Sequence, residues 1–234
     1  MNLQFTVQSL QTGLFFASID LSNKLAVAGN LASASDGLLG SDPLLLPLPD
    51  DAPPEFPRII VKDHQGQFQC QISPGRCDFL FGQTPGTPEQ TLDELFSSYL
   101  EYLLSLAGVL VSKHKASFHR IGFVPKFLAK LQISSNEFIR DRFMRRDFFQ
   151  GSYHIHVHTL HHLTLDGFEI NRWVRVRSAR SVSGPSDDRA ITVEIDMNTN
   201  PEIHYDLDAD RIRLFCLRAK DLTGSTLAEY FAES

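Results

Sequence analysis

The chain has 234 residues, of which 42% are hydrophobic, so it is long enough to bury the core of one large domain or of two small ones. Its formal net charge of −6 disfavours a general nucleic-acid binder, because binding to phosphates needs a cationic field. The three cysteines lack a CxxC spacing, and neither a leader sequence nor a membrane-spanning stretch is evident, so we expect a cytoplasmic protein with reduced thiols.

Residues 1–28 are predicted to form N-terminal strands. Apolar and polar residues alternate in "LQFTV", and the β-rich run "LFFASIDL" follows Gly13, which suggests a hairpin that turns near this glycine. Residues 29–57 are rich in proline, which fixes φ and removes a backbone donor, so we expect a loop or an extended strap without a regular helix. The run "PLLLPLP" in this segment is also compatible with a proline-rich ligand for a partner.

Residues 58–150 are predicted to form a first α+β lobe. Three strands, "RIIVKD", "QFQCQI" and "RCDFLFG", form a meander. A helix with an N-cap at Thr87 then carries an apolar stripe as far as Gly108. A strand "SFHRIGFV" and a short helix "SNEFIRDRFMRR", capped by Ser135 or Asn136, complete the lobe.

Residues 151–234 are predicted to form a second α+β lobe. It begins with a strand in "YHIHVHTLHHL", turns at Asp166 and Gly167, returns as "FEINRWVRVRSAR" and continues, after a loop at Gly184 and Pro185, as "AITVEIDMN". A last helix starts near Asp208. The fold class is therefore α+β, with two similar lobes, each an antiparallel sheet packed by a helix.

Three of these segments carry a resemblance. "RIIVKDHQGQFQCQISPGRCDFLF", "FHRIGFV" and "ITVEIDMN", in this order and spacing, resemble an uncharacterised, sporadically distributed bacterial protein family of unknown function. The resemblance implies a bacterial source and supports the α+β fold, but it implies no activity.

The histidine-rich strand contains the most distinctive chemistry of the sequence. Alternate side chains of a strand share a face, so His154, His156 and His158 point to one side of the sheet. If Asp166 and Gly167 form a two-residue turn, His156 lies opposite Arg177, His158 opposite Arg175, and Leu160 opposite Trp173.

These histidines allow two functional interpretations. A metal-dependent enzyme would use His154, His156 and His158, with His156, His158, Glu194 and Asp196 as the candidate ligands. The neighbouring arginines disfavour a cation there, and the two carboxylates are better placed to neutralise the guanidinium groups. We therefore expect no cofactor or metal, and histidines that are harder to protonate because of the arginines.

The favoured function is a non-catalytic protein-interaction module that binds a protein partner or a second copy of itself. The interaction surface is predicted to consist of His156, His158, Trp173, Arg175 and Arg177. Trp173 is expected to be covered, either by the helix that starts near Asp208 or by a second subunit.

Two further interpretations remain open. The basic segment 113–146, with interleaved phenylalanines, is compatible with a nucleic-acid-associated factor. Whether the chain is an enzyme is undecided: common phosphate-binding, serine-nucleophile and helical zinc motifs are missing, and Cys77 and Cys216 are predicted to be buried. The basic residues of segment 113–146 are Lys113, Lys115, Arg120, Lys126, Lys130, Arg140, Arg142, Arg145 and Arg146.

Overall fold

In the part of the chain that the structure describes, nine strands form one antiparallel sheet, in the spatial order β2-β3-β4-β5-β1-β6-β9-β8-β7. The computed structural model describes residues 3–49, 51–144, 155–179 and 189–232. The strands are β1 (Phe5–Ser18), β2 (Leu44–Leu45), β3 (Ile59–Lys62), β4 (Phe68–Ile72), β5 (Arg76–Gly82), β6 (Ser117–Lys130), β7 (His156–Leu165), β8 (Phe168–Ser178) and β9 (Ala190–Thr199). The helices are α1 (Lys24–Ala34), α2 (Leu92–His114), α3 (Ser135–Phe143) and α4 (Ala209–Phe231).

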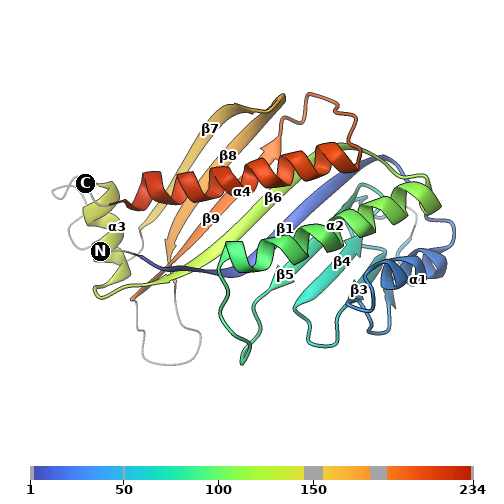
Figure 1. The fold of residues 1–234 in the computed structure, drawn as a ribbon, viewed down its shortest axis with the longest axis horizontal. Helices are drawn as coiled ribbons and strands as arrows, with labels where there is room; N and C mark the ends of the chain where they lie inside the picture. The colour runs from blue at the N-terminus through green and yellow to red at the C-terminus, as the bar shows by residue number, and fades with distance from the viewer. Residues whose placement is uncertain (1–2, 50, 145–154, 180–188, 233–234) are drawn as a thin grey trace.

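The helices α1, α2 and α4 lie on the same side of the sheet (Figure 1). The short helix α3 lies at one end of the molecule, where the ring of its Phe138 stacks on Phe231 at the end of α4, with 6.3 Å between centroids. The opposite side of the sheet carries none of the helices α1, α2 and α4, and we call it the open face. The chain is therefore a mixed α+β protein with one sheet and one main helical layer.

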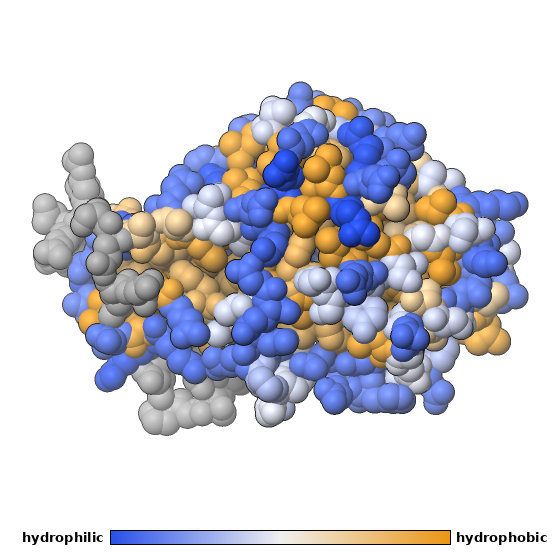
Figure 2. Space-filling view, in the orientation of Figure 1, coloured by the Kyte–Doolittle hydropathy of each residue, from blue (hydrophilic) through white to orange (hydrophobic). Residues whose placement is uncertain are grey.

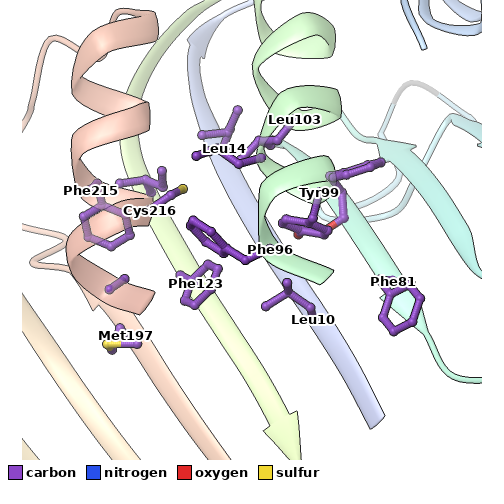
Figure 3. Close-up of a cluster of buried hydrophobic side chains, with 14 of the residues drawn as sticks. Leu10, Leu14, Phe81, Phe96, Tyr99, Leu103, Phe123, Met197, Phe215 and Cys216 are labelled. Atoms are coloured by element: carbon purple, nitrogen blue, oxygen red, sulfur yellow. The ribbon is translucent and has the colours of Figure 1, made fainter. Parts of the chain in front are cut away.

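The hydrophobic core fills the space between the sheet and the helices α2 and α4. Leu10 and Phe123 from the two central strands meet Phe96 and Tyr99 of α2 and Phe215 of α4 (Figure 3). These side chains share one side of the sheet because alternate residues of a strand point to the same face. On the outer surface of the helical layer, hydrophilic residues are interspersed with hydrophobic ones (Figure 2).

The sheet is continuous through both halves of the chain. The first half contributes β1 to β5 and the second half β6 to β9, and the two halves join where β1 pairs with β6. This arrangement confirms the α+β class, but it does not confirm two lobes that each have their own sheet.

The predicted N-terminal hairpin is wrong, because β1 is a single strand that passes straight through Gly13. A side chain at this position would be crowded by its neighbours. It lies opposite Gly122 on β6, and a Cβ added at Gly13 would stand 3.2 Å from Asp78 Oδ1 on the open face. Here a glycine reflects a close side-chain approach instead of a turn.

The segment 29–57 contains more regular structure than predicted. The helix α1 begins at Lys24, within the predicted strand region, and runs on to Ala34, and β2 adds a two-residue edge strand. Asn23 caps α1, since its side chain accepts a hydrogen bond from the backbone N–H of Ala26 at 3.0 Å. Leu39 is fully buried, so part of the following segment packs on the body as a strap.

The helix α2 starts and ends later than predicted. Its N-cap is Thr91, where a capping box forms with Glu94, and the backbone N–H of Thr91 donates to Glu94 Oε2 at 2.7 Å. The helix continues past the exposed Gly108 to His114. Likewise, β6 continues beyond Val124 through the buried Pro125, close to a bulge in β1, where a proline is tolerated.

Among the described residues, α2 is the one helix that meets the length and composition of a membrane span, with a mean hydropathy of 1.4 over its best window. The sequence-based expectation of no such stretch therefore missed it. The helix nevertheless packs on the sheet: the Tyr99 hydroxyl donates to the carbonyl of Phe79 at 2.8 Å, and its oxygen accepts from the Thr12 hydroxyl at 3.0 Å. Its apolar composition is used in the protein core.

Most of the remaining elements agree with the prediction. The meander of β3, β4 and β5 is confirmed, as are β7, β8 and β9. Ser134 precedes α3, in place of the predicted cap at Ser135 or Asn136, and its side chain makes no capping hydrogen bond. The helix α4 begins as predicted after Asp208, whose carboxylate accepts from the N–H of Arg211 at 2.8 Å. The predicted loop at Gly184 and Pro185 lies outside the described residues.

Candidate functional site

The predicted site residues lie on the open face, at the end of the sheet formed by β7, β8 and β9. In β8, the buried residues Arg172, Val174 and Val176 point to the helical side, and Arg172 Nη1 donates to Thr226 Oγ1 of α4 at 2.8 Å. Trp173, Arg175 and the other odd-numbered residues of β8 therefore point to the open face.

The register of the β7–β8 hairpin is the predicted one. Asp166 and Gly167 form the turn with φ values of 45° and 82°, as a two-residue type I′ turn requires. His156 pairs with Arg177, His158 with Arg175, and Leu160 with Trp173. Four of the five predicted surface residues are thus brought into two cross-strand pairs, and Trp173 lies beside them.

Arg175 is the centre of a charge ladder on this face. Its Nη1 donates to Glu194 Oε1 at 2.5 Å and to Asp196 Oδ2 at 3.1 Å, both on β9. The three side chains are only 18% to 26% exposed, so the ion pairs are partly shielded from water. Lys126 on β6 continues the row, because it lies opposite Glu194 in the register of β6 and β9. The prediction that the carboxylates neutralise the arginines is confirmed for Arg175.

The electrostatic environment disfavours a charged His158. Partial burial and then the positive charges of Arg177 and Arg175 lower the pKa of His158 below its usual value. The ring of His156 stacks in parallel at 6.3 Å between centroids. The expected difficulty of protonation is therefore confirmed at His158, and this part of the surface presents a neutral imidazole at neutral pH.

The candidate metal ligands do not form a cluster. Glu194 and Asp196 direct their carboxylates to Arg175, as described above, and Asp196 also accepts from the side-chain amide of Asn198. Within the described part of the chain, no group of three or more His, Cys, Asp or Glu side chains is placed to hold a metal ion. His154, the third histidine of the alternative, lies outside the described residues.

Trp173 lies on the open face and is not covered by α4. It pairs with Leu160 on one side and with Asp196 on the other, and the guanidinium carbon of Arg175 stands 5.5 Å from its ring centroid. The helix α4 packs on the opposite side of the sheet, against Arg172, so of the two predicted covers the one by this helix is wrong, and the one by a second subunit stays a prediction. Leu160, beside the tryptophan, is 39% exposed.

The other half of the open face carries a second polar cluster that the sequence interpretation missed. Asp78 on β5 is buried; it accepts from Gln11 Nε2 at 2.8 Å and forms an ion pair with Arg76 at 2.6 Å. The guanidinium of Arg120 stacks on Phe15 at 4.1 Å. The alternation in "RCDFLF" places Arg76 and Asp78 on one face, but nothing in the sequence shows that β1 lies between β5 and β6 and brings Gln11 and Phe15 to this cluster.

The predicted basic segment is spread over several elements. Arg120 stacks on Phe15 as described, Lys130 pairs with Glu89 at 3.0 Å, and Arg142 Nε donates to the carbonyl of Tyr230 at 2.8 Å. The interleaved Phe138 and Phe143 pack against Phe231 at the end of α4. The remaining members are Lys113 and Lys115 at the end of α2, Lys126 on β6 and Arg140 on α3, while Arg145, Arg146, Phe148 and Phe149 lie outside the described residues.

The cysteines are buried, as predicted for Cys77 and Cys216, and all three are free thiols. Burial raises the pKa of the Cys216 thiol to about 12. The pKa of Cys77 is also raised, first through its hydrogen bond with Cys70, whose sulfur lies 3.5 Å away, and then through burial. Thiols held in the protonated form are poor nucleophiles.

A cavity of about 400 Å³ opens beside the start of α2, lined by polar residues that include Thr91, Glu94 and Lys130. Its acidic group Glu94 is occupied in the capping box with Thr91, which lowers the pKa of that carboxyl through a backbone hydrogen bond. The cavity is therefore lined by the N-terminal end of α2 and its capping residues, and its described lining does not place a nucleophile beside a general base.

Comparison of the chain with protein-family models and with curated proteins finds no match.

Proposed function

We propose that this protein is a non-catalytic interaction module that binds a partner protein through the open face near β7, β8 and β9. The observation that carries the proposal is the exposed Leu160 beside Trp173, next to the Arg175 ion pairs and away from the helical layer. Tryptophan and arginine are enriched in protein interfaces, where a large ring gives contact area and a guanidinium gives directed hydrogen bonds.

The polar groups around Trp173 support binding better than catalysis. Arg175 is held by Glu194 and Asp196, and His158 favours its neutral form. A general base or a metal site would need ionisable groups that are free to accept a proton or a cation. Pre-ordered ion pairs of this kind suit an interface, because the side chains are already fixed before the partner arrives.

In vivo cross-linking followed by mass spectrometry tests the proposal. A photo-cross-linking residue at Arg177 should capture a partner, and Trp173→Ala should weaken its binding by about 10-fold or more in a reconstituted titration. Leu217→Ala is the matched control, because Leu217 is 42% exposed on α4 at the helical side. Binding that survives Trp173→Ala and is lost in Leu217→Ala would place the interface on the helices and overturn the proposal.

The two alternative functions make different predictions. A metal-dependent enzyme using His156 and His158, with Glu194 and Asp196, requires about one metal per chain in elemental analysis, lost when both histidines become alanine. A nucleic-acid-associated factor using segment 113–146 requires binding that weakens steeply with salt. The spread of the basic residues over α2, β6 and α3 and the pairing of the carboxylates with Arg175 favour the interaction module over both.

We further propose that the chain consists of two similar lobes and acts in the bacterial cytoplasm. The element order supports the lobes, with bounds that differ from the predicted 58–150 and 151–234: β1, α1, then the meander β3 to β5 and α2 are followed by β6, α3, then the meander β7 to β9 and α4. The sheet order is symmetric about the β1–β6 pair when β2 is set aside. Co-expressed halves, cut between residues 115 and 116, should then reassemble, and failure of both to fold together would contradict the proposal.

The proposed location in the cytoplasm is supported by the cysteines, because buried free thiols suit a reducing compartment.

A further inference from the structure

The strand β7 forms the outer edge of the sheet, and it is a long edge. It pairs with β8 over ten consecutive residues without a register shift, whereas the opposite edge, β2, has only two residues. Edge strands are normally protected by lysine, proline, a bulge or a short length, because their unpaired backbone groups can bind another strand. The β7 sequence, "HVHTLHHLTL", contains none of these residues and no acidic residue.

The hairpin geometry determines which backbone groups of β7 bond to β8 and which point away from it. In a two-residue hairpin the residues next to the turn, here Leu165 and Phe168, form a hydrogen-bonded pair, and such pairs then alternate along the ladder. Every second residue of β7, from Leu165 back to Val157, thus bonds to β8. The N–H and C=O groups of the others point outward, and these residues are His156, His158, Leu160, His162 and Thr164.

The order of residues in β7 is self-complementary. If two copies of β7 pair antiparallel about a two-fold axis at Leu160, each apolar residue meets an apolar one and each polar residue meets a polar one. On the open face Leu160 meets Leu160 of the second copy, and His158 meets His162. The other opposed pairs are His156 with Thr164, Val157 with Leu163, and Thr159 with His161. Shifting the axis by one residue, to His161, would place Leu160 opposite His162 and lose this match.

We infer that β7 binds β7 of a second copy of this chain, antiparallel, with the two-fold axis at Leu160. The outward groups of the two strands form about ten backbone hydrogen bonds, two for each hydrogen-bonded pair. The row from Trp173 through Leu160 continues into Leu160 and Trp173 of the second copy, because Leu160 pairs with Trp173 in each. No charged side chain of β7 opposes the contact.

The inference rests on the proposed function in one respect, namely that this region binds protein, and it deepens that proposal by naming a second copy as a partner. Self-pairing joins the two open faces into one continuous sheet surface, with the helical layers of both copies on the other side. The exposed apolar area of Leu160 then becomes the centre of an interface, where hydrophobic contacts contribute most.

Sedimentation of the full chain gives the first test. The wild-type protein should sediment at twice 26.3 kDa, and Leu160→Lys should sediment at 26.3 kDa, because two ammonium groups would meet at the axis. Leu44→Lys is the matched control: it introduces the same charge at an exposed leucine of the opposite edge, β2, and should leave the dimer intact. Circular dichroism verifies that both variants are folded. A monomeric wild type, or a dimeric Leu160→Lys variant that is folded, would overturn the inference.

Engineered cysteines test the register. At the axis, Leu160→Cys brings two Cα atoms to about 5.5 Å, within disulfide range, so mild oxidation should give a covalent dimer. His158→Cys lies on the same face but is about 14 Å from its own copy across the axis, and it should stay uncross-linked. The three native thiols are buried and do not interfere. Cross-linking through residue 158 in place of 160 would refute the axis at Leu160.

The outcomes separate this inference from the proposed function. A monomeric wild type that still loses its cross-linked partner in Trp173→Ala would refute β7 pairing alone. A dimer whose partner binding is indifferent to Trp173→Ala would refute the proposed function alone.

Discussion

The Arg175 ion pairs allow a quantitative prediction about the open face. Replacing Arg175 by glutamine removes the positive charge that holds Glu194 at 2.5 Å and Asp196 at 3.1 Å. Exposed pairs contribute about 0–1 kcal/mol, and breaking a buried pair costs about 3–5 kcal/mol. At 18% to 26% exposure the site lies between these limits, so we expect Arg175→Gln to lower the free energy of unfolding by about 1–3 kcal/mol.

Arg177→Gln is the matched control for this measurement. Arg177 lies two residues further along β8 on the same face, and it pairs across the sheet with Thr192 and His156, neither of which is an acid. Its replacement should change the free energy of unfolding by less than about 0.5 kcal/mol. Urea unfolding followed by far-ultraviolet circular dichroism measures both variants. Tryptophan fluorescence is less suitable, because Arg175 lies over the Trp173 ring and its replacement would change the fluorescence directly.

A double-mutant cycle identifies the cause of the loss. If the ion pair is responsible, Arg175→Gln should cost much less in a Glu194→Gln background than in the wild type, with a coupling energy of about 0.5–3 kcal/mol. Equal losses for Arg175→Gln and Arg177→Gln, or a coupling energy near zero, would show that Arg175 contributes through its aliphatic stem and not through its charge. The charge ladder would then have no energetic basis.

Four other results are expected. Tyr99→Phe should lower the free energy of unfolding by about 1–3 kcal/mol in urea titrations, because it removes two buried hydrogen bonds, and an unchanged value would contradict their importance. His158 should titrate below its ordinary value in proton NMR; since the unfolded chain then binds the proton more readily, stability should fall as the pH is lowered through about 6.5, and a raised pKa would reverse that slope. Cys216 should resist thiol reagents until the chain unfolds, and rapid labelling of the native protein would contradict its burial. Gly122→Ala should destabilise by about 1 kcal/mol, because its Cβ would overlap Asn198 Oδ1, turn that side chain away and break its hydrogen bond to Asp196; a Gly122→Ala variant as stable as wild type would refute the clash.

The predictable part of the site came from local rules. Asp166 and Gly167 specify a two-residue turn, a turn of that length fixes the register, and the register places His158 opposite Arg175 without any information about the rest of the fold. Alternation in β9 then adds Glu194 and Asp196 to the same face. Each step depends on neighbours within one meander, which is why the charge ladder could be foreseen.

The errors have a different origin, because they concern glycine and proline in non-local contacts. The sequence predicts a turn at Gly13 and a helix end at Gly108. Instead, a Cβ at Gly13 would crowd Asp78 Oδ1 of the neighbouring strand β5, and Gly108 lies on the exposed side of a helix that tertiary packing sustains. Pro125 lies inside a central strand near a bulge in β1. The residues that make these choices tolerable are far apart in the sequence, so no local pattern reports them.

The edge position of β7 belongs to the same class of information. The alternation that placed His156, His158 and Leu160 on one face also follows from the sequence, and so does the outward direction of their backbone groups once the hairpin is known. What the sequence leaves undetermined is whether a further strand of the same chain uses those groups. Among the described residues the sheet order answers this, because β9 pairs with β8 and leaves β7 outermost. The polar–apolar symmetry of β7 about Leu160 is therefore relevant to binding only in the folded chain, where β7 is an edge strand. The histidine-rich segment is then also a strand that can pair antiparallel with a second copy of itself.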